Sequence, residues 1–266
     1  MNKKNIIYNM SMLANQRREK ILELICEDGH AKVLNLSRIF KVTEVTIRQD
    51  LERLEKEGLI RREHGGAVLV DIGAGVRNIT LQNQKNNMPE KMAIARRAVS
   101  FIKNGDTIIL DSGSTTTEIA KLITDFQDIT VITNALNIAL ILGAYPNINL
   151  VVTGGEFKAP TLSLTGQKAA DFFYNLNVDK LFLATAGITL KSGLTYPSIS
   201  DICVKRAMIE SANEVYLVAD SSKIGLNSFA SLGALSLINL LITDSNITER
   251  NKEMLENNEI YYVVAE

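Results

Sequence analysis

The chain has 266 residues, of which 46% are hydrophobic and 22% are charged, and its formal net charge at pH 7 is −1. These values describe an ordinary soluble globular protein with room for one large domain and a small one. No apolar run approaches the ~20 residues that a membrane-spanning helix needs, and the N-terminus lacks the continuous hydrophobic region of a secretion signal. We therefore expect a cytoplasmic protein with no membrane partner.

The charged residues are unevenly distributed along the chain, and its two cysteines lie far apart. Residues 1–70 carry 13 lysines and arginines against 10 acidic residues, and the rest of the chain carries 16 against 20. A mildly basic N-terminal piece on a mildly acidic body is compatible with a nucleic-acid-binding module joined to a sensor. The two cysteines, Cys26 and Cys203, fall in helical patterns without disulfide-framework or metal-site spacing. We expect two reduced thiols, no metal and no cofactor.

Three helices are predicted early in the chain, after a tail of residues 1–16. The first covers Arg17–Asp28, where Ile21 and Ile25 share one face, and the second covers Leu34–Phe40. His30, between them, is expected to lie in a loop. Only a few residues separate the second helix from the third, which is the spacing of a helix-turn-helix.

The third helix, within Val42–Gly58, carries the strongest functional signal. Ile47, Leu51 and Leu54 form its apolar stripe, and Thr43 is positioned as its N-cap. The opposite side presents arginine, glutamine and threonine side chains, which can reach phosphates and base edges in a DNA major groove. A surface helix with solvated charges is the alternative for this helix taken alone. On it we predict DNA contacts for Thr43, Glu44, Thr46, Arg48, Gln49 and Arg53.

Two β-prone runs follow, in Leu59–Val70, and they flank a turn that contains two glycines. A hairpin here would carry Arg61, Arg62 and His64, and three helices plus a basic hairpin make a winged helix-turn-helix over residues 17–70. The arginines fit phosphate contacts better than solvated charges, because they lie on the predicted wing. His64 fits either a DNA contact or a turn residue.

The sequence VTEVTIRQDLERLEKEGLIRREHGGAV resembles the signature of the DeoR-type bacterial transcriptional regulators. The pattern is long and ordered, and it implies sequence-specific binding to double-stranded operator DNA. One position departs from it, because Gln49 stands where an arginine is usual. Glutamine can read an adenine edge but carries no permanent charge, so this change affects operator preference and phosphate anchoring.

Residues 71–88 are polar, rich in glycine and asparagine and poorly periodic, so we predict a linker. A helix then opens at Pro89 and runs over Glu90–Ile102. Beyond it, strands and helices alternate, which predicts a mainly parallel α/β domain over residues 89–266, with both sheet faces covered. The predicted strands are Thr107–Leu110, Thr130–Thr133, Asn149–Thr153, Lys180–Ala184, Val215–Ala219, Leu240–Thr243 and Ile260–Val264. The predicted helices between them are Thr116–Thr124, Ala135–Leu142, Gly166–Tyr174, Cys203–Ala212 and Thr248–Asn257.

The turns after these strands are rich in small residues, hydroxyls, amides and carboxylates. In an open α/β sheet the carboxyl ends of the strands form the ligand-binding edge, and this composition suits a polyol phosphate. The turn DSGSTT, at Asp111–Thr116, is the best phosphate candidate, because it leads straight into a helix N-terminus with free N–H groups. Each turn alone is also what any α/β fold uses to end a strand.

Two cations are candidates for binding the phosphate near these turns, Lys205 and Lys223. For Lys205 a solvated helix position is the alternative, and the neighbouring Arg206 is expected to be structural or exposed. Carboxylates at Asp111, Glu156 and Asp220 could supply acid–base chemistry together with Lys205, so the residue inventory leaves an enzyme open.

The resemblance continues through LDSGSTT, VITN, VVTGG, DKLFLATAGI, VKRAMI and ADSSKIG, in the order of the DeoR-type sensor domain. That domain is similar to ribose-5-phosphate isomerase, and family members respond to phosphorylated sugars or related metabolites. Asp201 departs from the glutamate that is often found there, so effector identity cannot be copied across. The resemblance implies an effector pocket formed by Asp111, Gly113, Ser114, Thr115, Thr116, Thr133, Asn134, Gly154, Gly155, Gly187, Lys205, Asp220 and Lys223.

These features together predict a repressor of a carbohydrate operon whose operator binding is modulated by a phosphorylated sugar, with no catalytic residues. One winged module contacts few bases, so we expect a homo-oligomer, a dimer or a tetramer, on repeated half-sites. The alternative is a sugar-phosphate isomerase-like enzyme with a DNA-binding appendage. The sequence does not distinguish a repressor from an activator.

Overall fold

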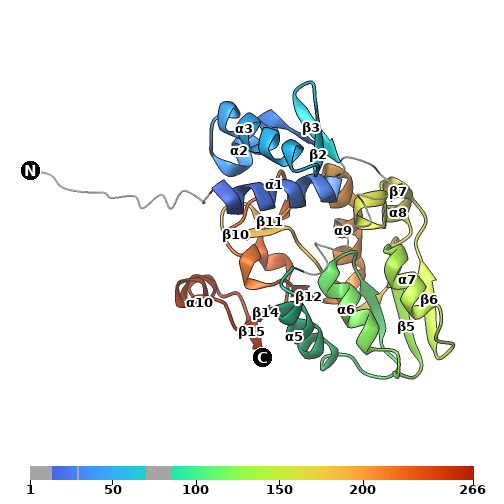
Figure 1. The fold of residues 1–266 in the computed structure, drawn as a ribbon. Coiled ribbons are helices and arrows are strands. Elements are labelled where there is room, and N and C mark those ends of the chain that lie inside the picture. Colours follow the sequence, from blue (N-terminus) through green and yellow to red (C-terminus); the bar gives the residue numbers. More distant parts are fainter. Residues whose placement is uncertain (1–13, 29, 70–85) are drawn as a thin grey trace, which may run out of the picture. The chain divides into compact units, whose positions relative to one another are not determined.

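A computed structural model describes residues 14–28, 30–69 and 86–266 (Figure 1). Two compact units make up the chain, Met1–Gly75 and Val76–Glu266. Residues 1–13 of the predicted tail and residues 71–85 of the predicted linker lie outside the described residues. Within residues 14–28, 30–69 and 86–266, no helix has both the length and the apolar composition to cross a membrane.

Over residues 14–28 and 30–69 the first unit contains three helices and a small antiparallel sheet in the order β1-β3-β2. The predicted helix-turn-helix is present, and Gly65 forms the turn of the predicted hairpin with a positive φ of 79°. The apolar positions predicted on the helices form its core, with Ile21, Ile25, Leu36 and Ile47 buried. The elements are α1 (Ala14–Asp28), β1 (His30–Lys32), α2 (Val33–Phe40), α3 (Glu44–Lys56), β2 (Ile60–Glu63) and β3 (Gly66–Leu69).

The prediction of a loop at His30 was wrong. His30 opens β1, which pairs with β3 so that His30 lies opposite Val68 and Lys32 opposite Gly66. Three residues are too few to show strand periodicity, and the pairing depends on a hairpin more than thirty residues away. A Cβ on Gly66 would lie 2.3 Å from the Ala31 carbonyl oxygen, so glycine is what lets the two strands approach.

The ends of α3 follow from local sequence. The Thr43 hydroxyl caps the helix by accepting from the Thr46 N–H at 3.2 Å. At the other end Gly58 adopts a positive φ of 73°, and the Leu59 N–H donates to the Leu54 carbonyl at 3.1 Å. Asp50, on the inner face, is buried and accepts from Arg17 Nε at 2.6 Å, which ties α1 to α3.

The second unit is built on a seven-stranded, wholly parallel sheet, which confirms the predicted fold class. All seven predicted strands belong to it, with ends shifted by up to three residues. In spatial order they are β15 (Tyr262–Ala265), β14 (Leu240–Asp244), β12 (Ala212–Val218), β9 (Val178–Leu183), β4 (Thr107–Leu110), β5 (Ile129–Thr133) and β6 (Ile148–Val152).

Helices cover both faces of this sheet, and each face has its own apolar core. Successive side chains of β4 point to opposite faces, so Ile108 packs in one core and Ile109 in the other. The first core contains α5 (Met88–Val99), α6 (Ser114–Leu122) and α7 (Leu136–Leu142); the second contains α8 (Gln167–Asp171), α9 (Ile199–Ser211) and α10 (Glu249–Glu256).

The strand order reverses direction between β4 and β9. From β4 the chain proceeds outward through β5 to β6, then returns to β9 and proceeds the other way through β12, β14 and β15. In open parallel sheets the crevice beyond the carboxyl ends at such a reversal is where ligands bind. The geometry therefore selects the turns after β4 and β9 as the central part of the predicted edge.

Several short elements were not predicted. Each has three or four residues, which is too few for a periodic signal. The helix α9 also begins four residues before its predicted start, because the Ser198 hydroxyl caps it. The unpredicted elements are β7 (Glu156–Lys158), η1 (Ala159–Thr161), β8 (Ser163–Thr165), β10 (Gly187–Thr189), β11 (Gly193–Tyr196), η2 (Ser221–Lys223), β13 (Ala230–Gly233) and η3 (Leu235–Leu237).

Candidate functional site

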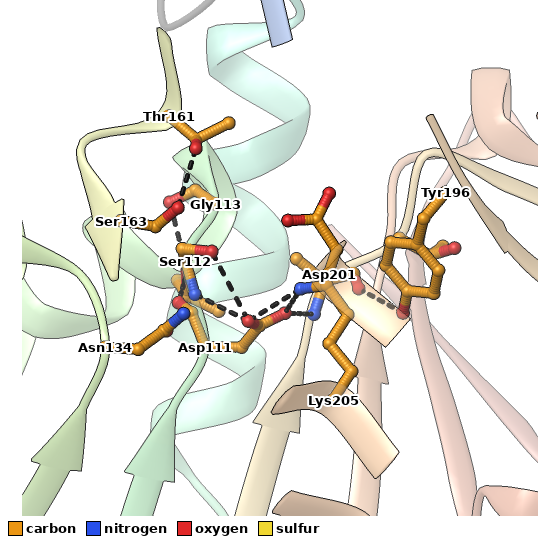
Figure 2. A network of polar contacts seen from close by, with 12 residues as sticks. Asp111, Ser112, Gly113, Asn134, Thr161, Ser163, Tyr196, Asp201 and Lys205 are labelled. Atoms are coloured by element: carbon orange, nitrogen blue, oxygen red, sulfur yellow. Dashed lines mark hydrogen bonds and ion pairs between the residues drawn. The ribbon is translucent and has the colours of Figure 1, made fainter. Parts of the chain in front are cut away.

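A buried ion pair lies where the strand order reverses (Figure 2). Asp111 follows β4 directly and is fully buried, and Lys205, on α9, places its Nζ 2.7 Å and 2.6 Å from the two carboxylate oxygens. Backbone N–H groups complete the set, since Ser112 donates to Oδ1 at 2.7 Å and Ala184 donates to Oδ2 at 3.0 Å. The structure thus brings together two predicted residues that are 94 positions apart.

Tyr196, on β11, packs against this ion pair, and the sequence did not predict it. Its ring lies over Lys205, with Nζ 4.8 Å from the ring centroid, and its hydroxyl donates to the Ala184 carbonyl at 2.7 Å. Burial, with a smaller contribution from the negative charge of Asp111, raises the pKa of the Tyr196 hydroxyl well above its usual range. The tyrosine therefore stays neutral and fixes the ammonium against Asp111.

The predicted phosphate turn forms the start of α6. Gly113 is extended, and a Cβ there would lie 2.7 Å from the Ala184 Cβ, so this turn packs closely against the end of β9. The Thr116 hydroxyl donates to the Asp111 carbonyl at 2.6 Å and is used within the turn. Ser114 and Thr115 begin the helix, where backbone N–H groups have no partner inside the helix.

The turn after β5 contributes a buried acceptor. The Thr133 hydroxyl donates to the Leu110 carbonyl at 2.7 Å, so its role in the structure is to join β5 to β4. The Asn134 amide donates to the Leu164 carbonyl at 3.0 Å, while its buried Oδ1 accepts no hydrogen bond from any described residue. A buried acceptor without a donor is costly, which makes Asn134 Oδ1 available to a ligand hydroxyl or a water.

A second lysine–carboxylate pair was also missed by the sequence reasoning. Lys158 Nζ, on β7, lies 2.9 Å from Asp201 Oδ2, and both side chains are about nine-tenths buried. Asp201 stands one helical turn before Lys205 on α9, so the two pairs share one helix face. Lys205 and Lys223 are therefore not the only cations at this edge, and only the short β7–β8 hairpin, absent from the predicted elements, brings Lys158 there.

The other predicted glycines differ in exposure, since Gly154 and Gly155 are exposed and Gly187 is buried. Gly154 and Gly155 form the turn between β6 and β7, with Gly154 exposed. Gly187 opens β10, where a Cβ would lie 2.5 Å from the Leu226 carbonyl oxygen. The close backbone approach at Gly187 explains a glycine there without a ligand.

Asp220 and Lys223 lie in a separate polar cluster after β12. Asp220 is buried and accepts from Asn87 Nδ2 at 3.1 Å and from the Ser222 N–H at 3.2 Å. Burial by itself raises the pKa of the Asp220 carboxyl, but the charges of Lys223 and Lys91 and these hydrogen bonds outweigh it and lower the pKa. None of the described contacts joins this cluster to the Asp111–Lys205 pair.

In the first unit the predicted DNA-contacting residues share the exposed face of α3 and the hairpin. The arginines are paired locally: Arg48 with Glu44 at 2.6 Å, Arg53 with Glu57 at 3.1 Å and Arg61 with Glu63 at 2.9 Å. Arg62 lies 4.0 Å from Glu55, and the Thr43 and Thr46 hydroxyls are 2.9 Å apart. Gln49 and His64 are exposed.

Among the described residues no group of three histidine, cysteine or acidic side chains forms a metal site.

Comparison with known families gives two matches that together span most of the chain. Residues 17–72 match the DeoR-like helix-turn-helix domain, and residues 86–245 match the DeoR C-terminal sensor domain. The first match contains α3 and the hairpin, and the second contains both lysine–carboxylate pairs.

Curated relatives match over nearly their whole length. The uncharacterized HTH-type transcriptional regulator YulB of Bacillus subtilis (strain 168) is 37% identical, covering 94% of this chain and 96% of that protein. The glycerol-3-phosphate regulon repressor of Escherichia coli (strain K12) is 31% identical, covering 88% and 92%. Among solved structures, ribose 5-phosphate isomerase from Plasmodium falciparum is similar over 52% of this chain and 53% of that one, with 19% identity and a TM-score of 0.38.

Proposed function

Because this chain belongs to the DeoR family of transcriptional regulators, we propose that it represses an operon for the use of a sugar or sugar derivative. A phosphorylated sugar binding to the second unit controls its affinity for operator DNA, which the first unit binds as part of a homo-oligomer. One relative is named the glycerol-3-phosphate regulon repressor, which supports a phosphorylated small carbohydrate as the effector class.

The observation that carries the effector proposal is the placement of two lysine–carboxylate pairs beside the start of α6. The helix N-terminus offers N–H groups to a phosphate. Lys158 is paired with Asp201, so it can exchange that carboxylate for a phosphate while Asp201 accepts from sugar hydroxyls. Asn134 Oδ1 supplies a further acceptor for a hydroxyl.

The same geometry favours a sensor over an isomerase. A general base needs a lone pair that can reach the substrate proton. The Asp111 carboxylate instead accepts from Lys205 and from two backbone N–H groups, and it has no exposed surface. It is therefore suited to hold Lys205 in place, not to remove a proton from carbon.

A thermal-shift screen of the full chain tests the proposal. The panel contains phosphorylated sugars and polyol phosphates, each beside its unphosphorylated counterpart, because a ligand that binds only the folded state raises its melting temperature. We expect a rise with a phosphorylated member of a pair and none with its counterpart. Turnover of ribose 5-phosphate above background would instead support the isomerase-like enzyme.

A matched pair of variants tests whether the thermal shift caused by the ligand depends on Lys158. Lys158→Ala removes the ion pair at the carboxyl edge, whereas Lys180→Ala removes an equally buried pair with Asp106 at the amino end of the strands. We expect Lys158→Ala to lose the thermal shift and Lys180→Ala to keep it. Loss of the shift in both variants, or in neither, would remove Lys158 from the effector site.

A further inference from the structure

The exposed face of α3 carries charged side chains, the Thr46 hydroxyl, which lies 2.9 Å from the Thr43 hydroxyl, and two further uncharged side chains. The charged members are held in ion pairs one helical turn apart, Glu44 with Arg48, Glu52 with Lys56 and Arg53 with Glu57. Each pair must open before its arginine or lysine can contact a base, and its glutamate is repelled by phosphates. The two uncharged side chains have no such constraint.

These two side chains are Val45 and Gln49. Val45 is 60% exposed on the first turn of α3, and Gln49, also exposed, makes no hydrogen bond with any described residue. They are four residues apart, so they lie on one helix face and about 6 Å apart along its axis. That separation corresponds to base pairs one or two steps apart, since bases on one strand rise by about 3.4 Å.

The chemistry of both side chains points to A·T pairs. The C5 methyl group of thymine is the apolar group that a base presents in the major groove, and an exposed valine gains by covering it. A glutamine amide donates and accepts in the arrangement that matches N7 and the N6 amino group of adenine. The first turns of a recognition helix are the part that reaches base edges.

We propose that Val45 and Gln49 together read two A·T pairs in each operator half-site, Val45 through a thymine methyl group and Gln49 through an adenine edge. Val45 was not among the DNA contacts predicted from the sequence. The proposal rests on DNA binding through α3. It adds that two side chains that form no hydrogen bond or ion pair with the described residues, and not the paired arginines alone, determine which bases are preferred.

The test begins by selecting duplexes from a random library with the full-length protein. Each thymine of the enriched duplex is then replaced, one at a time, by deoxyuridine, which removes only the C5 methyl group. We expect one thymine at which this replacement weakens binding roughly fourfold, the value of one buried methyl group. Replacing an adenine one or two steps away by 7-deazaadenine removes N7, and we expect a loss of about fivefold or more.

Three variants assign the effects. Val45→Ala should bind the thymine and deoxyuridine duplexes equally, and alanine at this exposed position preserves the helix. Leu34→Ala is the control, because it removes an exposed apolar side chain, 47% exposed, from α2; it should keep the fourfold difference. Gln49→Arg should change the preferred base at one position from adenine to guanine when the selection is repeated.

The outcomes separate this proposal from DNA binding itself. An enriched duplex with no methyl-sensitive thymine overturns the role of Val45, and so does methyl sensitivity that survives in Val45→Ala. An unchanged base preference in Gln49→Arg overturns the role of Gln49. Failure to enrich any duplex would overturn DNA binding and, with it, the proposal.

Discussion

At the scale of single residues, the charge on Asp111 is balanced by one side chain. The carboxylate is fully buried, and Lys205 is the cation that contacts both of its oxygens. A buried pair of this kind adds little net stability compared with an apolar pair, but removing one partner leaves the other charge uncompensated. The destabilising change is therefore the loss of one member of the pair while the other stays charged.

We predict that Lys205→Met lowers the free energy of unfolding by about 3–5 kcal/mol at pH 7, measured by urea denaturation. The double variant Lys205→Met with Asp111→Asn should recover much of this loss, because no charge remains buried and the asparagine oxygen can still accept from the Ser112 N–H. An equal loss in both variants would show instead that packing under Tyr196 causes the destabilisation.

The sequence predicts the positions of some residues of the site but not of others. Asp111 follows a predicted strand and Lys205 lies on a predicted helix, so their positions at the carboxyl edge could be inferred from the strand pattern. Lys158 and Tyr196 lie on β7 and β11, which have three and four residues. No periodic signal marks such strands, and their positions depend on packing against elements far along the chain.

At the scale of elements, the start of α6 and the end of β9 are in tight contact. Gly113→Ala would put a methyl group 2.7 Å from the Ala184 Cβ, and overpacking of this kind costs typically ~1–3 kcal/mol. The φ of Gly113 is −178°, so steric contact and not backbone strain is the cause.

We predict that Gly113→Ala lowers the free energy of unfolding by about 1–3 kcal/mol and weakens effector binding, because it displaces the N-terminus of α6. Ala184→Gly in the same chain removes the opposing methyl group and should restore part of both properties. Denaturation and thermal shift with the screening hit measure the two effects. A double variant no better than Gly113→Ala would rule out this contact as the cause.

The turn after β12 joins the start of α5 through Asp220 and Asn87, and this junction depends on pH. The folded pKa of Asp220 lies below its unfolded value of about 3.9. The ionised carboxylate therefore contributes stability that is present above pH ~4 and is lost as pH falls through the folded pKa.

We predict that Asp220→Asn is less stable than the wild type at pH 7 and that the difference shrinks as the pH falls below about 4. Urea denaturation at a series of pH values measures it. Asp125→Asn, at an exposed carboxylate, is the control and should follow the wild-type curve. A difference that stays constant down to pH 3 would mean that the carboxylate charge is not what stabilises the junction.

At the scale of the whole molecule, the sequence predicted the α/β class but not the order of the strands. Each long strand carries enough Val, Ile and Leu to be recognised alone. Which strands become neighbours is decided by packing between elements far apart in the sequence, as when β4 pairs with β9 and Ile108 lies opposite Lys180. The reversal at which we propose the effector binds arises from that order, and no pattern within a single strand or helix predicts it.

A repressor of this design couples two ligands, and the coupling must be reciprocal. If the effector lowers operator affinity by some factor, saturating operator must lower effector affinity by the same factor. The factor is set by the difference in effector affinity between the DNA-binding arrangement and the others, so tight effector binding alone produces no release.

We predict that the compound identified in the thermal-shift screen binds the full chain about 5–150-fold more weakly when the selected duplex is saturating. Titration calorimetry with and without duplex measures one side of the linkage, and duplex binding with and without the compound measures the other. The two factors should agree within error. Equal affinity for the compound in both conditions would identify a bound ligand that does not control DNA binding, and tighter binding in the presence of duplex would identify a co-repressor.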